Sequence, residues 1–388
     1  MLSDALHERD TNVLPAAPSA PSTPLRDTAW HGQLQLLASL PHSLLTLAPA
    51  IAASVRSGMR ADFASIGLCD SATLTPTGFW TERVSEALLY WLGRHADELL
   101  ALTPLTLQRD SDGQAVRDTF DAPGWSTHPV YQGAFGPLGA RWGTGVPLLD
   151  RQDRCLGFIY LYRAEAEGRF SDAEQRRLRD VRDRLRGLAS AHAAPGTRDT
   201  PTVPTRSALL RIDAQGRIRA RSADAYELLF LGQHQQLGSL TWAAADLTAL
   251  PAPVAERARQ LLDEPAAPAC DELTLRDDGG GMRYRMERLI DAGADAAELV
   301  LTLCHLEPID LAVARQLTRW PLTPRERQLA VASARTDSQR EMASALGCSL
   351  GTLKGYMRSL YAKLGVASRE AMIERLLAGA ASAAPTSR

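Results

Sequence analysis

The sequence predicts a multidomain α+β protein, in which two mixed α/β parts precede an all-α C-terminal part. A chain of 388 residues has enough material for two to four domains. Two Pro-rich stretches, LPAAPSAPSTPL at 14–25 and AAPGTRDTPTVPTRS at 193–207, interrupt regular structure. Apolar, β-rich runs follow each stretch, whereas the segment beyond residue 307 shows only helical periodicity.

The composition is that of an ordinary globular protein, with 45% hydrophobic and 23% charged residues and a net charge of −2. Five cysteines lie far apart and form no CxxC, which fits a reducing compartment. The N-terminus lacks the pattern of a signal peptide, and the longest apolar stretch, 44–55, is too short to span a bilayer. We expect a cytoplasmic protein with no membrane partner.

The first part contains a strand at 62–69, DFASIGLC, and ends in a hairpin and a helix. The hairpin strands are TGVPLLD at 144–150 and CLGFIYLYR at 155–163, joined by the polar turn RQDR. Ser171 and Glu174 then form a capping box that opens a helix. This ending resembles that of a GAF domain, an α/β module that senses small molecules, and implies an unidentified ligand.

The second part opens with a strand, a turn and a strand, in LLRIDAQGRI at 209–218. After a helical middle come three further β runs, at 271–277, 282–290 and 298–306. An antiparallel meander after such an opening resembles a PAS domain.

Four amphipathic helices are predicted in the C-terminal part. Each begins at a residue that can cap its N-terminus: Thr323, Ser338, Ser349 and Ser368. Glu326 and Glu341 lie three residues after the first two caps, which predicts two capping boxes. A tight connection between the second and third helices is typical of a helix-turn-helix bundle.

The third of these helices has two distinct faces. A buried stripe is predicted from its apolar residues, Leu353, Met357, Leu360 and Leu364. Helical spacing places an outward set opposite the stripe, namely Gly351, Lys354, Gly355 and Arg358.

The motifs LTPRER, EMASALGCSLGTLKGYMRSLYAKLGV and SREAMIERL follow one another in the order and spacing of the LuxR/GerE-type DNA-binding domain. The sequence resembles that family over about 55 residues. The resemblance implies that the helix from Ser349 is the recognition helix, in the major groove of double-stranded DNA, and that the helix after Ser368 serves dimerisation. Thr352, Lys354 and Arg358 fall on family positions that meet phosphates or bases. The candidate DNA-binding set also contains Ser349, Gly351, Gly355 and Arg340.

Two departures from the family pattern matter. Thr336 stands where a Gly usually lies between the first two helices, and it tolerates positive φ less well. Gly351 and Gly355 stand where charged or bulky readers are common, and each Gly costs ~1 kcal/mol of helix propensity. We therefore expect DNA binding that depends on phosphates and shape more than on base readout.

Charge supports the DNA-binding hypothesis. Between 319 and 378 there are ten Lys and Arg against five acids, so this segment carries +5 in a chain of net charge −2. The only two lysines of the chain, Lys354 and Lys363, lie here, and compact ammonium groups suit contact with phosphates. Lys354 is expected to face the groove. Lys363 lies nearer the flank, where the alternatives are a phosphate contact and a solvated charge.

We divide the chain into seven segments: a disordered lead (1–29), a GAF-like sensor (30–192), a linker (193–205), a PAS-like domain (206–306), a connecting helix (307–319), the LuxR-type helix-turn-helix (320–379) and a disordered tail (380–388). The connecting helix carries Ile309, Val313, Leu317 and Trp320 on one face, by which it could pair with a second subunit.

The predicted function is a bacterial, homodimeric transcription regulator in which the sensor parts control DNA binding, with RNA polymerase as a candidate partner. No catalytic motif, metal site or cofactor is expected, and the residues that would bind a ligand are not identifiable. The alternatives are a signalling or scaffold protein whose helical domain binds a protein, and an enzyme whose site lies within 70–140. Cys69 and Cys155 are either buried structural thiols or a chromophore anchor or oxidant sensor.

Overall fold

The computed structural model describes residues 27–73, 76–82, 125–129, 131–186, 200–213, 215–223, 225–233, 250–263, 270–276, 279–289 and 298–381. Residues 1–26 of the predicted lead, 193–199 of the predicted linker, most of the region proposed for a hidden enzyme site and the tail beyond residue 381 lie outside the described residues. The expected bounds of the lead (1–29) and tail (380–388) were wrong at their inner ends, because residues 27–29 begin a helix and residues 380–381 end one.

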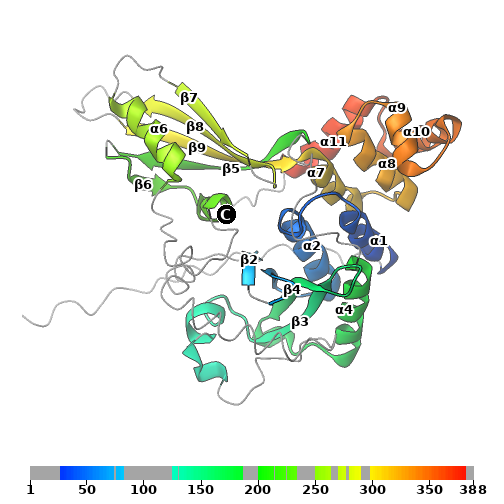
Figure 1. The fold of residues 1–388 in the computed structure, drawn as a ribbon, viewed down its shortest axis with the longest axis horizontal. Helices are drawn as coiled ribbons and strands as arrows, with labels where there is room; N and C mark the ends of the chain where they lie inside the picture. Colours follow the sequence, from blue (N-terminus) through cyan, green and yellow to red (C-terminus); the bar gives the residue numbers. More distant parts are fainter. Residues whose placement is uncertain are drawn as a thin grey trace, which may run out of the picture.

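The first part is built on a four-stranded antiparallel sheet in the order β2-β1-β4-β3. Its strands are β1 (Phe63–Cys69), β2 (Pro76–Thr81), β3 (Trp142–Leu149) and β4 (Cys155–Arg163). Helices cover one face: α1 (Asp27–Ala38), α2 (Leu44–Met59) and α4 (Asp172–Leu185). The predicted capping box of Ser171 and Glu174 begins α4, so that prediction is confirmed. Figure 1 shows this part at the bottom, with its helices between the sheet and the C-terminal bundle.

The second part is a five-stranded antiparallel sheet in the order β6-β5-β9-β8-β7. Its strands are β5 (Thr202–Ile212), β6 (Ile218–Arg221), β7 (Cys270–Leu275), β8 (Gly281–Leu289) and β9 (Glu298–Pro308). Two helices, α5 (Ala225–Gln233) and α6 (Ala252–Asp263), bury their apolar faces against it. Two strands, then helices, then three further strands follow one another here, which is the order that the sequence predicts for its PAS-like part.

Strand β5 begins earlier than predicted, inside the segment that we expected to be a linker without regular structure. Thr202 pairs with Pro308 and Pro204 pairs with Leu306, with a register shift before Arg206. Strand β6 pairs only with the C-terminal end of β5, at residues 210–212, so the N-terminal end of β5 has a neighbouring strand on one side only. The missing N–H of Pro204 is tolerated at such an edge. The expectation was wrong for residues 202–205, where the pairing with β9 overrides the local effect of proline.

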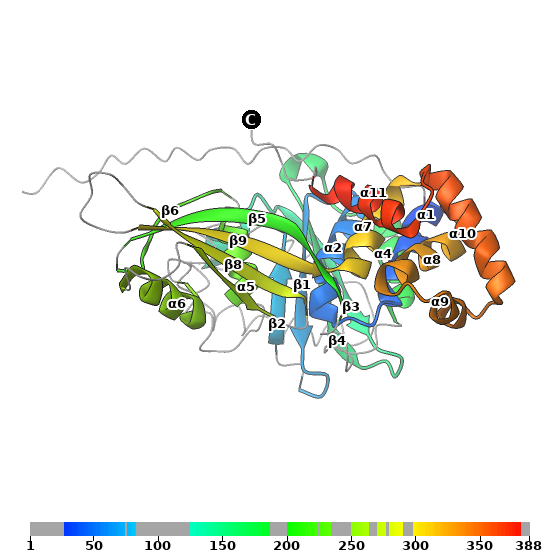
Figure 2. The same ribbon diagram turned by 90° about the horizontal axis from the view of Figure 1, so that it is seen from above.

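The C-terminal part is helical, as predicted. It contains α7 (Ile309–Gln316), a 3-10 turn (Leu317–Arg319), α8 (Pro324–Arg335), α9 (Gln339–Leu346), α10 (Leu350–Leu364) and α11 (Arg369–Ala381). Figure 2 shows α10 at the end of the molecule that is remote from the second sheet. Within the described ranges, no helix has the length and apolar character needed to cross a membrane.

The connecting helix α7 is buried within its own chain. Val313 and Leu317 are inaccessible to solvent, and α7 packs against α1, α8 and α11. We expected its apolar face to be available for a second subunit; in the structure the partner of that face is the same polypeptide. The N-terminal helices and the C-terminal bundle consequently share one hydrophobic core.

Candidate nucleic-acid interface

The caps of the C-terminal helices place the candidate interface. Thr323 and Glu326 form a reciprocal capping box at the start of α8, with Pro324 in the first turn. The backbone N–H of Thr352 donates to the Ser349 hydroxyl at 3.1 Å and so begins α10. Gly347 ends α9 with φ of 62°, a conformation that glycine adopts without strain. These local signals fix where the two helices of the motif meet.

The turn between α8 and α9 does not need a glycine. Thr336 is extended, with φ of −145° and ψ of 153°. Its hydroxyl donates to Glu341 at 2.6 Å and accepts the N–H of Ser338 at 3.1 Å. Ser338 caps α9 as predicted, but the Glu341 carboxylate bonds Thr336 instead of completing the second capping box. The threonine thus bridges the two helices through its side chain.

Helix α10 has the two faces that the sequence predicts. Leu353, Leu360 and Leu364 are fully buried and Met357 is half-buried. The outward set lies on the solvent side, where Gly351, Lys354, Gly355 and Arg358 are all exposed, together with Ser349 and Thr352. A basic, solvent-facing helix at the outer end of the molecule is accessible to a large polyanion.

The cations of this surface are available for a ligand. Lys354, Arg358 and Arg340 are exposed, and within the described ranges they form neither a hydrogen bond nor an ion pair. Arg340 lies in the first turn of α9. All three side chains come from the two helices of the motif, α9 and α10.

Neither glycine of α10 is required by packing. A Cβ at Gly355 would meet nothing within 4 Å, and one at Gly351 would lie 3.7 Å from the Ser349 hydroxyl oxygen. Both residues have ordinary helical backbone, without positive φ. The fold therefore gives no reason for the ~1 kcal/mol of helix propensity that each glycine forgoes.

Lys363 is engaged inside the domain and matches neither predicted alternative. Its Nζ lies 2.7 Å from Oε2 of Glu326, whose side chain is 4% exposed. The hydroxyl of Ser359 donates to the other carboxylate oxygen at 2.6 Å. Burial alone would raise the pKa of Glu326, but the hydrogen bonds from Lys363, Ser359 and Thr323 outweigh it and lower the pKa to about 2. The two lysines are both exposed but have different surroundings: Lys363 is paired with a buried carboxylate, whereas Lys354 forms no ion pair within the described residues.

A polar contact that sequence reasoning missed joins the bundle to the first part of the chain. Asp310, at the start of α7, is fully buried, and its Oδ1 lies 2.8 Å from Nε2 of His42. Arg335, at the end of α8, approaches Oδ2 at 3.5 Å. The Gln33 side chain of α1 donates to the carbonyl of Ala314 at 2.8 Å. We call these residues the junction. His42 and Asp310 are 268 positions apart, so local patterns carry no signal for their contact.

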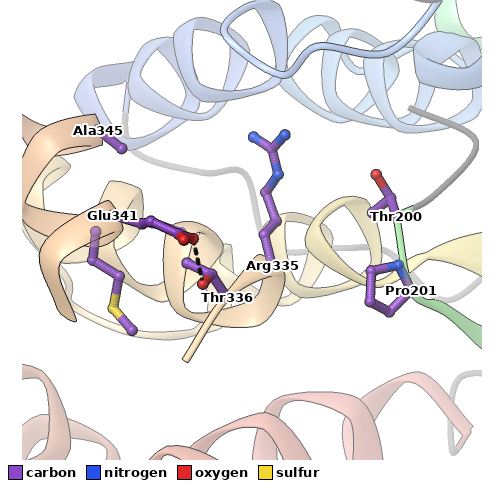
Figure 3. Close-up of a pocket in the computed structure, with 8 residues that line it drawn as sticks. Thr200, Pro201, Arg335, Thr336, Glu341 and Ala345 are labelled. Carbon is purple, nitrogen blue, oxygen red and sulfur yellow. Dashed lines mark hydrogen bonds between the residues drawn. The ribbon is translucent and has the colours of Figure 1, made fainter. Parts of the chain in front are cut away.

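Beside the junction lies a shallow pocket of about 350 Å³, lined by Thr200, Pro201, Ala332, Arg335, Thr336, Glu341, Met342 and Ala345. Figure 3 shows the Arg335 side chain extending across it and the hydrogen bond between Thr336 and Glu341.

His305, in strand β9, bonds the Thr205 hydroxyl at 3.2 Å, and burial together with Arg206 and Arg315 lowers the pKa of His305 to about 4. His305 is therefore a packed, neutral imidazole.

The arrangement of α8, α9 and α10 is that of a helix-turn-helix domain. Residues 320–376 match the family of bacterial regulatory proteins called luxR, or GerE, and form a helix-turn-helix domain of that family. The resemblance noted in the sequence is thereby confirmed.

Comparison with solved structures gives remote similarities. A complex of Vibrio cholerae VqmA with ligand and DNA is 15% identical, with a TM-score of 0.24, over 46% of this chain and 86% of that one. A VqmA dimer without target DNA is also 15% identical, with a TM-score of 0.18, over 45% and 83%. A DhaR(N)–DhaL complex of E. coli is 14% identical, with a TM-score of 0.22, over 72% and 88%. No curated protein matches the chain. At such TM-scores these structures carry no argument, and the identification of the helix-turn-helix domain rests on the family match of residues 320–376.

Proposed function

We propose that this protein is a DNA-binding transcription regulator in which the parts before residue 307 control the helix-turn-helix. One observation carries the proposal: a luxR-family domain presents a solvent-facing helix, α10, whose outward cations Lys354 and Arg358 are unengaged within the described residues. We assign the chain no catalytic activity, and we propose that it acts on double-stranded DNA as a homodimer.

The chemistry of the exposed face of α10 supports binding through phosphates. Lys354 and Arg358 project from one side of α10, and Arg340 lies in the first turn of α9. The two glycines leave that side without bulk, so the helix backbone can approach the duplex closely. We propose that these cations, with the hydroxyl groups of Ser349 and Thr352, position the domain on the DNA backbone.

The junction supports control by the N-terminal part. A buried carboxylate on α7 bonds a histidine that precedes α2 and approaches an arginine of α8, so movement of the first part must disturb the first helix of the DNA-binding domain. Helix α11, which the family resemblance links to dimerisation, packs against α7 in this arrangement. We propose that a signal received by the GAF-like or PAS-like part changes this packing.

Titration of the full-length protein with double-stranded DNA at several salt concentrations tests the proposal. Lys354→Met removes one exposed cation from α10, and Arg176→Ala, on an exposed face of α4, is the matched control. The proposal predicts measurable affinity at low salt, a salt slope reduced by about 1 for Lys354→Met, and an unchanged slope for Arg176→Ala. A folded protein without affinity at low salt would favour the alternative in which the bundle binds a protein partner.

A further inference from the structure

Two cysteines from different parts of the sequence meet on the first sheet. Cys69 ends β1 and Cys155 begins β4, and their sulfur atoms lie 3.8 Å apart. Both cysteines are in the thiol form, not in a disulfide. Cys69 is buried, at 4% exposure, whereas Cys155 is partly exposed.

A β-bulge produces this contact. Leu148 pairs with Gly157 and Leu149 pairs with Cys155, so β4 advances two residues while β3 advances one, and Leu156 is the extra residue. Side chains of a regular strand alternate between faces, which would place Cys155 on the same face as Ile159, in the helix-covered core. The bulge reverses the alternation.

The observed packing fits this account. Leu156 lies in the core with Ile159, and Cys155 packs on the opposite face against Phe158 and Cys69. Cys69 reaches that face because it follows Leu68, which points into the core. An irregularity of the strand therefore brings together two thiols that a regular register would separate.

We propose that Cys69 and Cys155 are a modification site that a hydroperoxide oxidises to a reversible disulfide. Disulfide formation requires the sulfur atoms to approach to about 2.05 Å. The two thiols are already in van der Waals contact on adjacent strands, so side-chain rotation closes the distance without a change in strand pairing.

The two cysteines have different roles in the reaction. The partly exposed sulfur of Cys155 attacks an oxygen of the hydroperoxide, the O–O bond breaks, and an alcohol or water leaves, so that Cys155 becomes a sulfenic acid. The sulfur of Cys69 then attacks that of Cys155, the S–O bond breaks, and water leaves with the Cys69 proton. Two thiols lose two electrons and the peroxide gains them.

The surroundings of Cys69 disfavour the first of these roles. Its thiol donates toward the Cys155 sulfur, and this hydrogen bond, together with burial, raises the pKa of Cys69 above its ordinary value. Cys69 therefore keeps its proton, and the more accessible Cys155 is the thiol that meets the oxidant.

The test is a peptide map of the full-length, reduced protein after treatment with hydrogen peroxide, with free thiols alkylated before digestion by trypsin. Cleavage after Arg60, Arg83, Arg154 and Arg163 gives peptides 61–83 and 155–163, each with one cysteine. We expect a cross-linked pair of these peptides, two hydrogen masses lighter than their sum, which disappears after dithiothreitol. Exposed Cys270 reports that the oxidant was active.

Three variants separate the possible outcomes. Cys69→Ser should leave Cys155 as a sulfenic acid that dimedone labels, Cys155→Ser should leave Cys69 reduced, and Cys270→Ser should leave the cross-link unchanged. If Cys69 and Cys155 remain alkylatable at a peroxide dose that oxidises Cys270, the pair is a packing contact and the proposal is overturned. The peptide map of the unsubstituted protein decides this by itself if a variant fails to fold.

Discussion

The ammonium group of Lys363, near the end of α10, lies 2.7 Å from the buried carboxylate of Glu326, in the first turn of α8. Glu326 also closes the capping box with Thr323. One carboxylate thus caps α8 and holds the far end of α10 against it, which fixes the orientation of α10.

The two lysines provide a matched pair of substitutions on one helix. Lys363→Met removes the cation that pairs with the buried Glu326 carboxylate and leaves it only its hydrogen bonds from Ser359 and Thr323, so we expect it to reduce the free energy of unfolding by about 2 kcal/mol. Lys354→Met, at an exposed position, should leave stability unchanged and weaken DNA binding. Denaturant unfolding and DNA titration of both variants measure the difference. Equal stability of the two variants would show that the ion pair contributes nothing.

The environment of Glu326 also predicts how stability depends on pH. Because its pKa is about 2 in the folded protein and ordinarily 4.5, the unfolded state binds the proton more tightly. The stabilisation is complete above about pH 5 and is lost as pH falls toward 2. Acid unfolding monitored by circular dichroism should therefore show a steeper loss of stability over this interval than Glu326→Gln does. Parallel pH profiles for the two proteins would contradict the assignment.

The junction can be tested through Asp310. Asp310→Ala removes the partner of His42 and Arg335, so we expect faster amide hydrogen exchange at the start of α2 and in α7. If the packing of α7 restrains α11, DNA affinity of the full-length protein should rise about fivefold. Asp180→Ala, at an exposed position of α4, is the matched control. Faster exchange with unchanged DNA affinity would leave the junction a structural role only.

The features that the sequence could predict depend on neighbouring residues. Capping boxes join residues three apart and the buried stripe of α10 follows from helical spacing, so the boxes of Ser171 and Thr323 and the stripe were confirmed. The box expected at Ser338 was wrong, because Glu341 bonds Thr336 instead. The turn at Thr336 was misjudged because its side chain replaces the backbone conformation that a glycine would supply. Lys363 and Glu326 are 37 positions apart, and their contact follows only from the packing of α10 on α8. The same holds for the contact of Cys69 with Cys155, which also requires a bulge.

The remaining question about the exposed side of α10 is why it carries glycines. If Gly355 is present so that the helix can approach DNA closely, added bulk should weaken binding while improving the fold. The Cβ of Gly355→Ala would meet nothing within 4 Å, and alanine has the better helix propensity by ~1 kcal/mol, so this variant should melt at a higher temperature.

Gly355→Leu provides the decisive comparison, because it adds volume on the exposed side of α10 without changing charge. Close approach to the duplex predicts that leucine lowers DNA affinity at least tenfold, equivalent to about 1.4 kcal/mol, at a melting temperature no lower than that of the unsubstituted protein. If this side of α10 makes no close contact with DNA, Gly355→Leu should be as stable and should bind DNA with the affinity of the unsubstituted protein. Melting temperature and DNA affinity should therefore be measured on the same three proteins. Full DNA affinity in Gly355→Leu would exclude close approach of α10 to the duplex. The presence of a glycine at this position would then have no functional explanation.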